Sequence, residues 1–371
     1  MIVGVPKELK DNEYRVAITP AGVRELVVHG HAVIIETDAG RGSSILDAEF
    51  ERAGARILPT ADHVFAEADM VLKVKEPVPE EFHRLRDGLV LFTFLHLAAS
   101  EPVTKALMES RTTGVAYETI EYPDRSLPLL APMSEVAGRM APHAGANLLE
   151  RGHGGRGILL GGVSGVRPAR VVVIGAGMSG MNAAWIAQGM EAEVIALDKN
   201  INKLRQIDQI HQGKILTLAS NRLVVEETVV SADLVIGAVL VPGAKAPKIV
   251  TREMVAAMRP GSVVVDISID QGGCFETSRM TTHSDPTYVV DDVIHYCVGN
   301  MPGAVPHTST YALTNATLPY VIALAEQGVE EAARQDPALA LGINTYKGEI
   351  VYAPVAEAHG LPSASLAEML G

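Results

Sequence analysis

The chain has 371 residues, of which 47% are hydrophobic and 20% are charged, and its formal net charge is −13. This length predicts two domains, and the hydrophobic content excludes a largely disordered chain. The negative charge argues against partners such as nucleic acid or an anionic membrane, and no apolar run approaches the ~20 residues of a membrane-spanning helix.

The first third of the chain alternates short apolar runs with helix-like stretches. Residues 2–5 begin the series as a strand, and Thr19 with Pro20 marks a helix start, with Thr19 as N-cap and Pro20 in the first turn. Further strands are expected at 32–36, 55–58, 70–74, 89–94 and 114–117, with helical segments at 47–53, 61–67 and 101–110. Strands that alternate with helices predict parallel βα units.

A second alternating series follows a long predicted helix at 134–150 and a glycine-rich stretch. Its strands are expected at 171–174, 193–197, 234–239 and 263–267, and another long helix at 306–327 comes after them. The remaining residues, about 330–371, are expected to be helical and irregular.

The two long helices flank the second series, as connectors into and out of an inserted domain would. We therefore predict an α/β fold with two doubly wound domains, in which a Rossmann domain of residues 129–306 is inserted into a second domain built from 1–128 and 307–371. Two consecutive domains with a helical tail are the alternative.

A glycine motif lies between the first strand of the second series and its helix. Gly175, Gly177 and Gly180 form G-x-G-x-x-G, which permits a tight turn, close approach to a pyrophosphate and packing of helix on strand. Asp198 ends the next strand, where a carboxylate binds ribose hydroxyls and repels a 2′-phosphate. This favours NAD over NADP, although Lys203 nearby weakens the preference. A plain tight turn beside a surface aspartate is the alternative.

Reactive side chains follow the predicted carboxyl ends of strands. Arg15, Lys75, His96 and Glu118 do so in the first series, and Asp270 does so in the second. Ligands of open α/β sheets bind at this edge, so one cleft between the domains could collect them all. Histidine suits proton transfer near neutrality, and an arginine fork suits a carboxylate.

Each of these residues also has a structural interpretation. Arg15 could be a surface cation beside Glu13, and Lys75 could pair with its neighbour or cap a strand end. His96 could be a core histidine, and Asp270 could cap the turn that follows it.

The two cysteines, Cys274 and Cys297, offer neither a disulfide framework nor zinc-ligand spacing. The start of the chain lacks the basic and apolar regions of a signal peptide. Together these features lead us to expect a cytoplasmic location.

Several sequence segments, in the same order along the chain, resemble those of the alanine dehydrogenase family over essentially its whole length. The matching segments are 6–8 with 15–20, 73–77, 94–96, 132–139, 237–243, 266–273 and 300–302. The resemblance implies reversible oxidative deamination of L-alanine, with water and NAD⁺, to pyruvate and ammonium. It also implies a homohexamer.

The resemblance implies residue roles as well. Arg15 and Lys75 would bind the substrate's carboxylate and oxygen, and His96 and Asp270 would be the acid/base pair. The cofactor site would be lined by Ser134, Gly175, Gly177, Met178, Ser179, Gly180, Asp198, Lys203, Ser220, Val239, Leu240, Ile267, Ser268, Ile269, Arg279, Val298, Gly299, Asn300 and Met301.

Some members of the family bind a divalent metal through a glutamate at position 118 and a histidine on the late helix. Position 327 is Gln327 here, and no histidine lies nearby in that helix, so we predict no metal site of that kind. The runner-up function is the nucleotide-binding subunit of a proton-translocating transhydrogenase, which would need a membrane partner. A non-catalytic NAD sensor is a third hypothesis. The complete set of reactive residues argues against both.

Overall fold

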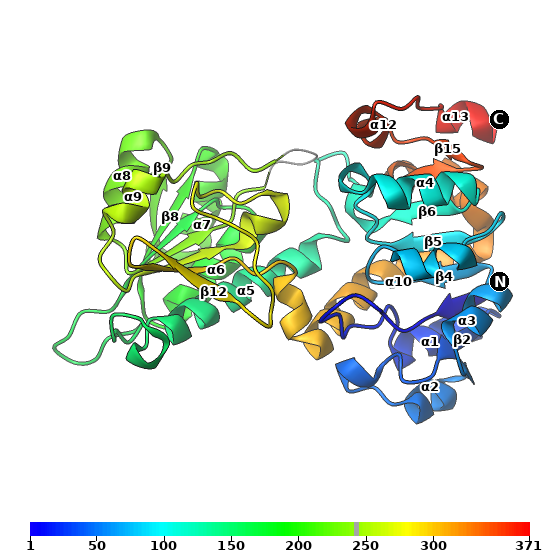
Figure 1. Ribbon diagram of the computed structural model, residues 1–371, viewed down its shortest axis with the longest axis horizontal. Helices are drawn as coiled ribbons and strands as arrows, with labels where there is room; N and C mark the ends of the chain where they lie inside the picture. Colours follow the sequence, from blue (N-terminus) through cyan, green and yellow to red (C-terminus); the bar gives the residue numbers. More distant parts are fainter. Residues whose placement is uncertain (241–244) are drawn as a thin grey trace. The chain divides into compact units, whose positions relative to one another are not determined.

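The structure is a computed structural model that describes residues 1–240 and 245–371. The chain forms two compact units: the first contains Met1–Met133 and Val305–Gly371, and the second contains Ser134–Ala304. Both chain ends, blue and red in Figure 1, belong to the first unit. The second unit is therefore an insertion in the first and spans Ser134–Ala304, whereas the sequence predicts an inserted domain of residues 129–306.

The first unit is built on an eight-stranded sheet of order β15-β14-β6-β5-β4-β1-β2-β3. Its six parallel strands are β1 (Ile2–Val5), β2 (Ala32–Glu36), β3 (Arg56–Leu58), β4 (Met70–Leu72), β5 (Val90–Thr93) and β6 (Thr113–Ala116). The strand order reverses between β1 and β4, the kind of position at which ligands of open α/β sheets bind at the carboxyl edge.

The helices between these strands begin close to where the sequence predicts them. They are α1 (Pro20–Val28), α2 (Asp47–Ala53), α3 (Ala61–Glu67) and α4 (Glu101–Glu109). In α1 the Thr19 side chain accepts a hydrogen bond from the Gly22 N–H, and Pro20 occupies the first turn. Both features satisfy the start of a helix at little conformational cost.

The carboxy-terminal segment completes this sheet, and here the sequence-based expectation was wrong. Residues 330–371 contain β14 (Ile343–Tyr346) and β15 (Glu349–Ile350), which extend the sheet antiparallel beside β6. All four residues of β14 are buried, but the polar Asn344 and Thr345 interrupt the continuous apolar run that marks a buried strand in sequence. The helices are α10 (Pro306–Gln335), α11 (Pro337–Gly342), α12 (Ala353–His359) and α13 (Leu366–Leu370).

Helix α10 is the late helix predicted to end at residue 327. Its backbone leaves the helical conformation at Gly328, with φ 72° and ψ 170°, and a second helical segment follows. The predicted end therefore coincides with the kink, and the chain resumes a helix beyond it.

The second unit is built on a seven-stranded sheet of order β12-β13-β11-β10-β7-β8-β9, in which only β12 is antiparallel. The strands are β7 (Arg170–Ile174), β8 (Glu193–Asp198), β9 (Leu216–Ala219), β10 (Leu234–Gly237), β11 (Val263–Asp266), β12 (Thr287–Val290) and β13 (Val293–Tyr296). The order reverses between β7 and β10, as in dinucleotide-binding folds. The predicted α/β class with two doubly wound sheets is confirmed.

Three strands of this sheet, β9, β12 and β13, were not predicted from the sequence. Strand β9 has no buried residue, so no apolar core pattern marks it. Strands β12 and β13 form a hairpin through Asp291 and Asp292, both with positive φ. Two aspartates between valine-rich runs are a hairpin signal that the sequence did offer.

Helices cover both faces of the second sheet: α5 (Ala131–Leu148), α6 (Met178–Gly189), α7 (Ile201–His211), α8 (Arg222–Ser231) and α9 (Arg252–Ala256). In β7, Val171 and Val173 pack in one apolar cluster with α5 and α6, while Val172 and Ile174 pack in another with α8 and α9. A strand buried on both faces reads as a continuous apolar run, which is why β7 was predictable. No helix among the described residues is long and apolar enough to cross a membrane.

Candidate active site

The loops after β1 and β4 meet at the point where the first sheet reverses its order. The loop after β1 carries Arg15, which is 2% exposed and pairs with Glu13 through both carboxylate oxygens, Nε–Oε1 at 2.6 Å and Nη2–Oε2 at 2.5 Å. Nη1 lies 3.0 Å from the sulfur of Met133. The alternative that Arg15 is a surface cation beside Glu13 is wrong about its location, because both side chains are buried and form a fixed ion pair.

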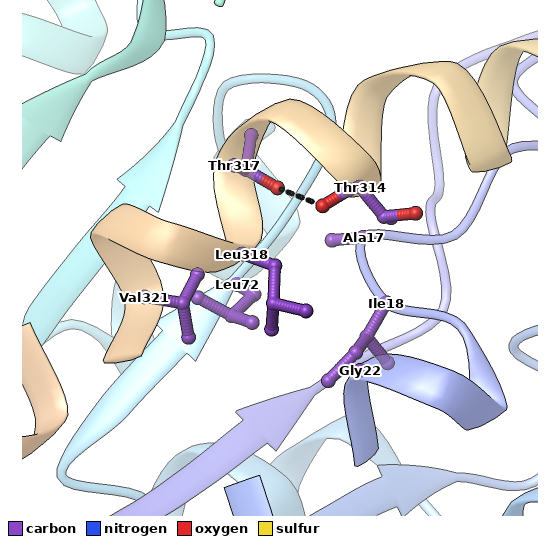
Figure 2. Close-up of a pocket in the computed structure, with 8 residues that line it drawn as sticks. All are labelled: Ala17, Ile18, Gly22, Leu72, Thr314, Thr317, Leu318 and Val321. Atoms are coloured by element: carbon purple, nitrogen blue, oxygen red, sulfur yellow. Dashed lines mark hydrogen bonds between the residues drawn. The ribbon is translucent and has the colours of Figure 1, made fainter. Parts of the chain in front are cut away.

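Helix α10 holds the Arg15 loop from the other end of the sequence. The Val16 N–H donates to the Thr310 hydroxyl at 3.1 Å, and Ser43 joins the same hydroxyl at 2.8 Å. Figure 2 shows Ala17 and Ile18 facing this helix across a cavity of about 10 Å³. A cavity of that size accommodates about one water molecule, so it is a packing defect and not a substrate pocket.

A buried charge cluster lies where the loops after β1 and β4 begin. The Lys73 ammonium is 3.2 Å from Glu8 and 3.0 Å from Glu81, and all three side chains are almost fully buried. Burial alone would lower the pKa of Lys73, but the two carboxylates outweigh it and raise that pKa. Burial raises the pKa of Glu8 in spite of Lys73. Glu8 also accepts the Val74 N–H at 2.6 Å, so the cluster fixes the backbone next to Lys75.

Glu76 lies near two of the predicted site residues. Its carboxylate pairs with Lys10. Burial opposes ionisation of Glu76, but the hydrogen bond from Lys10 and the positive charges of Lys10, His96 and Lys75 outweigh it and lower the pKa. Lys75 and His96 are therefore within electrostatic reach of one carboxylate, which the sequence analysis did not identify as part of the site.

His96 is presented at the carboxyl end of β5 on an unusual backbone. It has φ 49° and ψ 37°, the left-handed region, and it precedes the 3₁₀ turn η3 (Leu97–Ala99). Its side chain is 43% exposed, with the ring parallel to Phe94 at a centroid distance of 5.8 Å. An exposed ring on a constrained backbone is unlike a core histidine and suits a group that meets a ligand.

Glu118, at the end of β6, lies beside this histidine. Its two oxygens accept the Leu95 N–H, each at 3.2 Å, and Oε1 accepts the His96 N–H at 2.6 Å. Gln327 is exposed on α10. Among the described residues no group of three or more histidine, cysteine, aspartate or glutamate side chains is arranged to hold a metal ion.

The glycine motif of the second unit forms a turn that excludes side chains. Gly175 has φ 101°, and a Cβ there would lie 2.5 Å from the Ala238 carbonyl oxygen. A Cβ on Gly180 would lie 1.7 Å from the Gly175 oxygen. Gly177 is the N-cap of α6 and supplies no side-chain cap, which leaves the helix N-terminus to an anion.

Asp198, at the end of β8, is tied to this turn. Its Oδ2 accepts the Ala176 N–H and its Oδ1 accepts the Asn200 N–H, both at 2.7 Å. The carboxylate therefore stands beside the glycine turn, where a ribose would meet it. The Lys203 ammonium, from α7, lies 4.0 Å from the position that a Cβ on Gly177 would take.

Asp270 follows β11 in the 3₁₀ turn η6 (Ile267–Gln271). The buried Asp266 begins this turn and accepts the Ser268 N–H at 3.0 Å, and the Ser268 hydroxyl accepts the Val239 N–H at 2.9 Å. Asp270 is exposed, and its Oδ1 accepts the Asn300 N–H at 3.4 Å. Asp270 therefore precedes the Gly272 turn, as the structural alternative expected, and it also contacts the segment after β13.

The remaining predicted cofactor residues lie mainly at the same edge of the second sheet. Arg279 stacks on Tyr288 at 4.0 Å, and the Ser220 N–H bonds to the Asp198 carbonyl. Ser134 lies on α5, whose Gly138 packs against Ser179. Residues 241–243, part of a segment that carries the family resemblance, lie outside the described residues. The others follow strand ends: Met178 and Ser179 after β7, Val239 and Leu240 after β10, Ile267, Ser268 and Ile269 after β11, and Val298, Gly299, Asn300 and Met301 after β13.

A larger hollow, of about 780 Å³, lies at the other end of the second unit. It is lined by the last turns of α5, the segment between α5 and β7, and Met190 and Glu191, which follow α6. These residues sit at the amino edge of the sheet, whereas ligands of such folds bind at the carboxyl edge. None of the predicted site residues lines it.

Family models match both parts of the chain. Residues 4–137 match the model described as "Alanine dehydrogenase/PNT, N-terminal domain", and residues 141–353 match "Alanine dehydrogenase/PNT, C-terminal domain". The chain is 58% identical, over 370 residues and 100% of both chains, to an alanine dehydrogenase of Mycolicibacterium smegmatis.

Solved structures show the same likeness. An L-alanine dehydrogenase superposes with a TM-score of 0.94 at 48% identity, covering 97% of this chain and 99% of that one. A transhydrogenase from Sinorhizobium meliloti superposes with a TM-score of 0.81 at 28% identity, covering 95% and 99%. Both the sequence and the structure are thus more similar to the dehydrogenase.

Proposed function

The chain belongs to the alanine dehydrogenase/PNT family, and from that premise we propose that it catalyses the reversible oxidative deamination of L-alanine to pyruvate and ammonium with NAD. It is an amino-acid dehydrogenase. The observation that carries the proposal is the full set of Arg15, Lys75, His96 and Asp270, each following the carboxyl end of a strand.

The glycine turn fits a dinucleotide. Gly175 and Gly180 leave no room for side chains, and Gly177 leaves the start of α6 open to a pyrophosphate. Asp198 would bind the adenosine ribose and disfavour a 2′-phosphate, which supports NAD over NADP. NAD held at this turn would supply the acceptor, and in reverse the donor, for the hydride on the Cα of the amino acid.

The substrate carboxylate would be held by the first unit. Arg15 offers a planar fork, and its bidentate contact with Glu13 fixes the orientation of the guanidinium. Lys75 would bind the oxygen of pyruvate or part of the carboxylate. Because Glu8 pins the adjacent Val74 N–H, the lysine extends from a fixed backbone.

Proton transfer would fall to His96 and Asp270. In the direction of amine formation, the protonated imidazole of His96 donates a proton at the substrate oxygen as water leaves. The Asp270 carboxylate accepts a proton from the incoming amine, and both roles reverse during deamination. We also propose a cytoplasmic location and a homohexameric assembly, as the family resemblance implies.

One assay tests the proposal and separates it from the transhydrogenase alternative. The purified chain is mixed with NAD⁺ and L-alanine at mildly alkaline pH, and NADH absorbance is followed. We expect NADH to form without any partner protein. Failure to oxidise L-alanine, combined with hydride exchange between two nucleotides, would overturn the proposal in favour of the transhydrogenase.

A further inference from the structure

The catalytic turn around His96 needs something to hold it. A residue other than glycine with φ 49° adopts an unfavourable left-handed conformation that persists only where the surroundings impose it. The Leu95 and His96 N–H groups point away from the strand ladder and require an acceptor. The contacts of this turn therefore decide whether the imidazole stays in place.

Those contacts come from one carboxylate and from the chain beyond the turn. Glu118, whose side chain is 16% exposed, accepts both N–H groups. On the other side, the Leu97 carbonyl accepts from His359 Nε2 at 2.7 Å and from the Thr104 hydroxyl at 3.2 Å. The turn is thus held at its N–H groups by Glu118 and at its carbonyl by α4 and α12.

We propose that Glu118 is a positioning residue that fixes the left-handed His96 turn through its backbone N–H groups. This inference rests on the proposed function, in which His96 transfers a proton. Both oxygens of Glu118 are directed at these backbone N–H groups.

The arrangement of the acceptors gives a sharp prediction. Oε1 reaches both N–H groups, at 3.2 Å from Leu95 and 2.6 Å from His96, while Oε2 shares only the Leu95 N–H, also at 3.2 Å. A Glu118→Gln variant whose amide oxygen takes the Oε1 position therefore keeps an acceptor for both N–H groups, and it loses the negative charge and the second contact to Leu95. A Glu118→Ala variant loses both contacts. A metal ligand or a proton acceptor would instead be disabled by either change.

The test compares both variants with a matched control, Glu121→Gln. Glu121 is close in sequence and pairs with Arg125, away from the turn. We expect Glu118→Gln and the control to keep kcat within about threefold of the wild type. We expect Glu118→Ala to lose about 10- to 100-fold in kcat, the cost of a misplaced catalytic group, with the KM for NAD⁺ unchanged. Equal losses in both Glu118 variants, or wild-type kcat in Glu118→Ala, would overturn the inference.

A second measurement does not depend on activity. Hydrogen exchange of the Leu95 and His96 amides reports directly on the acceptor. We expect protection in the wild type and in Glu118→Gln, and at least about tenfold faster exchange in Glu118→Ala. Failure of the wild type to oxidise L-alanine would refute the proposed function, whereas unchanged exchange in Glu118→Ala would refute the positioning role.

Discussion

Replacement of Gly177 by alanine separates the two reasons for a glycine in the nucleotide turn. Gly177 has φ −76°, which any residue adopts, and an added Cβ would meet nothing closer than the flexible Lys203 ammonium at 4.0 Å. The protein without ligand should therefore tolerate Gly177→Ala. The added methyl group would, however, occupy the space in which a pyrophosphate approaches the start of α6.

The expected magnitude follows from the contacts that a displaced phosphate loses. No side chain caps α6, so its first N–H groups are the donors that the anion would use. Loss of one such hydrogen bond to a charged group costs about 1.5–3 kcal/mol. At 1.4 kcal/mol per factor of ten, the Kd for NADH should rise about 10- to 150-fold.

Gly180→Ala is the matched comparison, because its Cβ would lie 1.7 Å from the Gly175 oxygen. The helix must shift, and overpacking of this kind costs about 1–3 kcal/mol. Fluorescence titration with NADH and thermal unfolding of the ligand-free protein measure both effects. Gly177→Ala should weaken binding at an unchanged Tm, and Gly180→Ala should lower the Tm by several degrees. If Gly177→Ala binds NADH like the wild type, the assignment of this turn to the pyrophosphate is wrong.

Three further substitutions test other parts of the site. His96→Ala should lower turnover at least ~10²-fold in steady-state assays and leave NADH titrations nearly unchanged, whereas normal turnover would remove its proton-transfer role. Asp198→Ala should weaken NAD binding and narrow the preference over NADP, and an unchanged ratio of the two Kd values would count against a ribose contact. Lys73→Met should lower the free energy of unfolding by ~3–5 kcal/mol in urea titrations, because Glu8 and Glu81 lose their buried partner, and a loss under ~1 kcal/mol would contradict that pairing.

The sequence analysis predicted a feature correctly where the residues that determine it are neighbours in the chain. The start of α1 needs only Thr19 and Pro20, which are adjacent. The glycine turn needs only Gly175 to Gly180 and the strand before them, and its steric reason is local as well. Buried parallel strands such as β7 and β10 are continuous valine and isoleucine runs, which need no knowledge of their partners.

Features that depend on distant partners were not predictable. Glu8 and Lys73 are 65 residues apart, and nothing in either segment shows that burial joins them. The partnership of Arg15 with Glu13 is visible in the sequence, but its burial depends on the packing of α10 from the other chain end. Strand β14 is likewise recognisable only beside β6, since the polar Asn344 and Thr345 interrupt its apolar run and Thr345 bonds to the β6 backbone.

Four carboxylates near the strand ends share one structural role, which is to accept hydrogen bonds from loop N–H groups. The same contacts determine what is lost when each is replaced by its amide. Glu8, Glu118, Asp198 and Asp266 each accept a backbone N–H from a loop at the carboxyl edge of their sheet. Acceptors of this kind hold loops whose N–H groups find no strand partner.

Their geometries differ, because Oε1 of Glu118 reaches both N–H groups while Oε2 only shares the Leu95 N–H, whereas Asp198 uses a different oxygen for each of its two N–H groups. An amide has one acceptor oxygen and therefore replaces the first carboxylate but not the second. The number of oxygens in use, and not the charge alone, thus decides which of these acidic residues the fold can exchange.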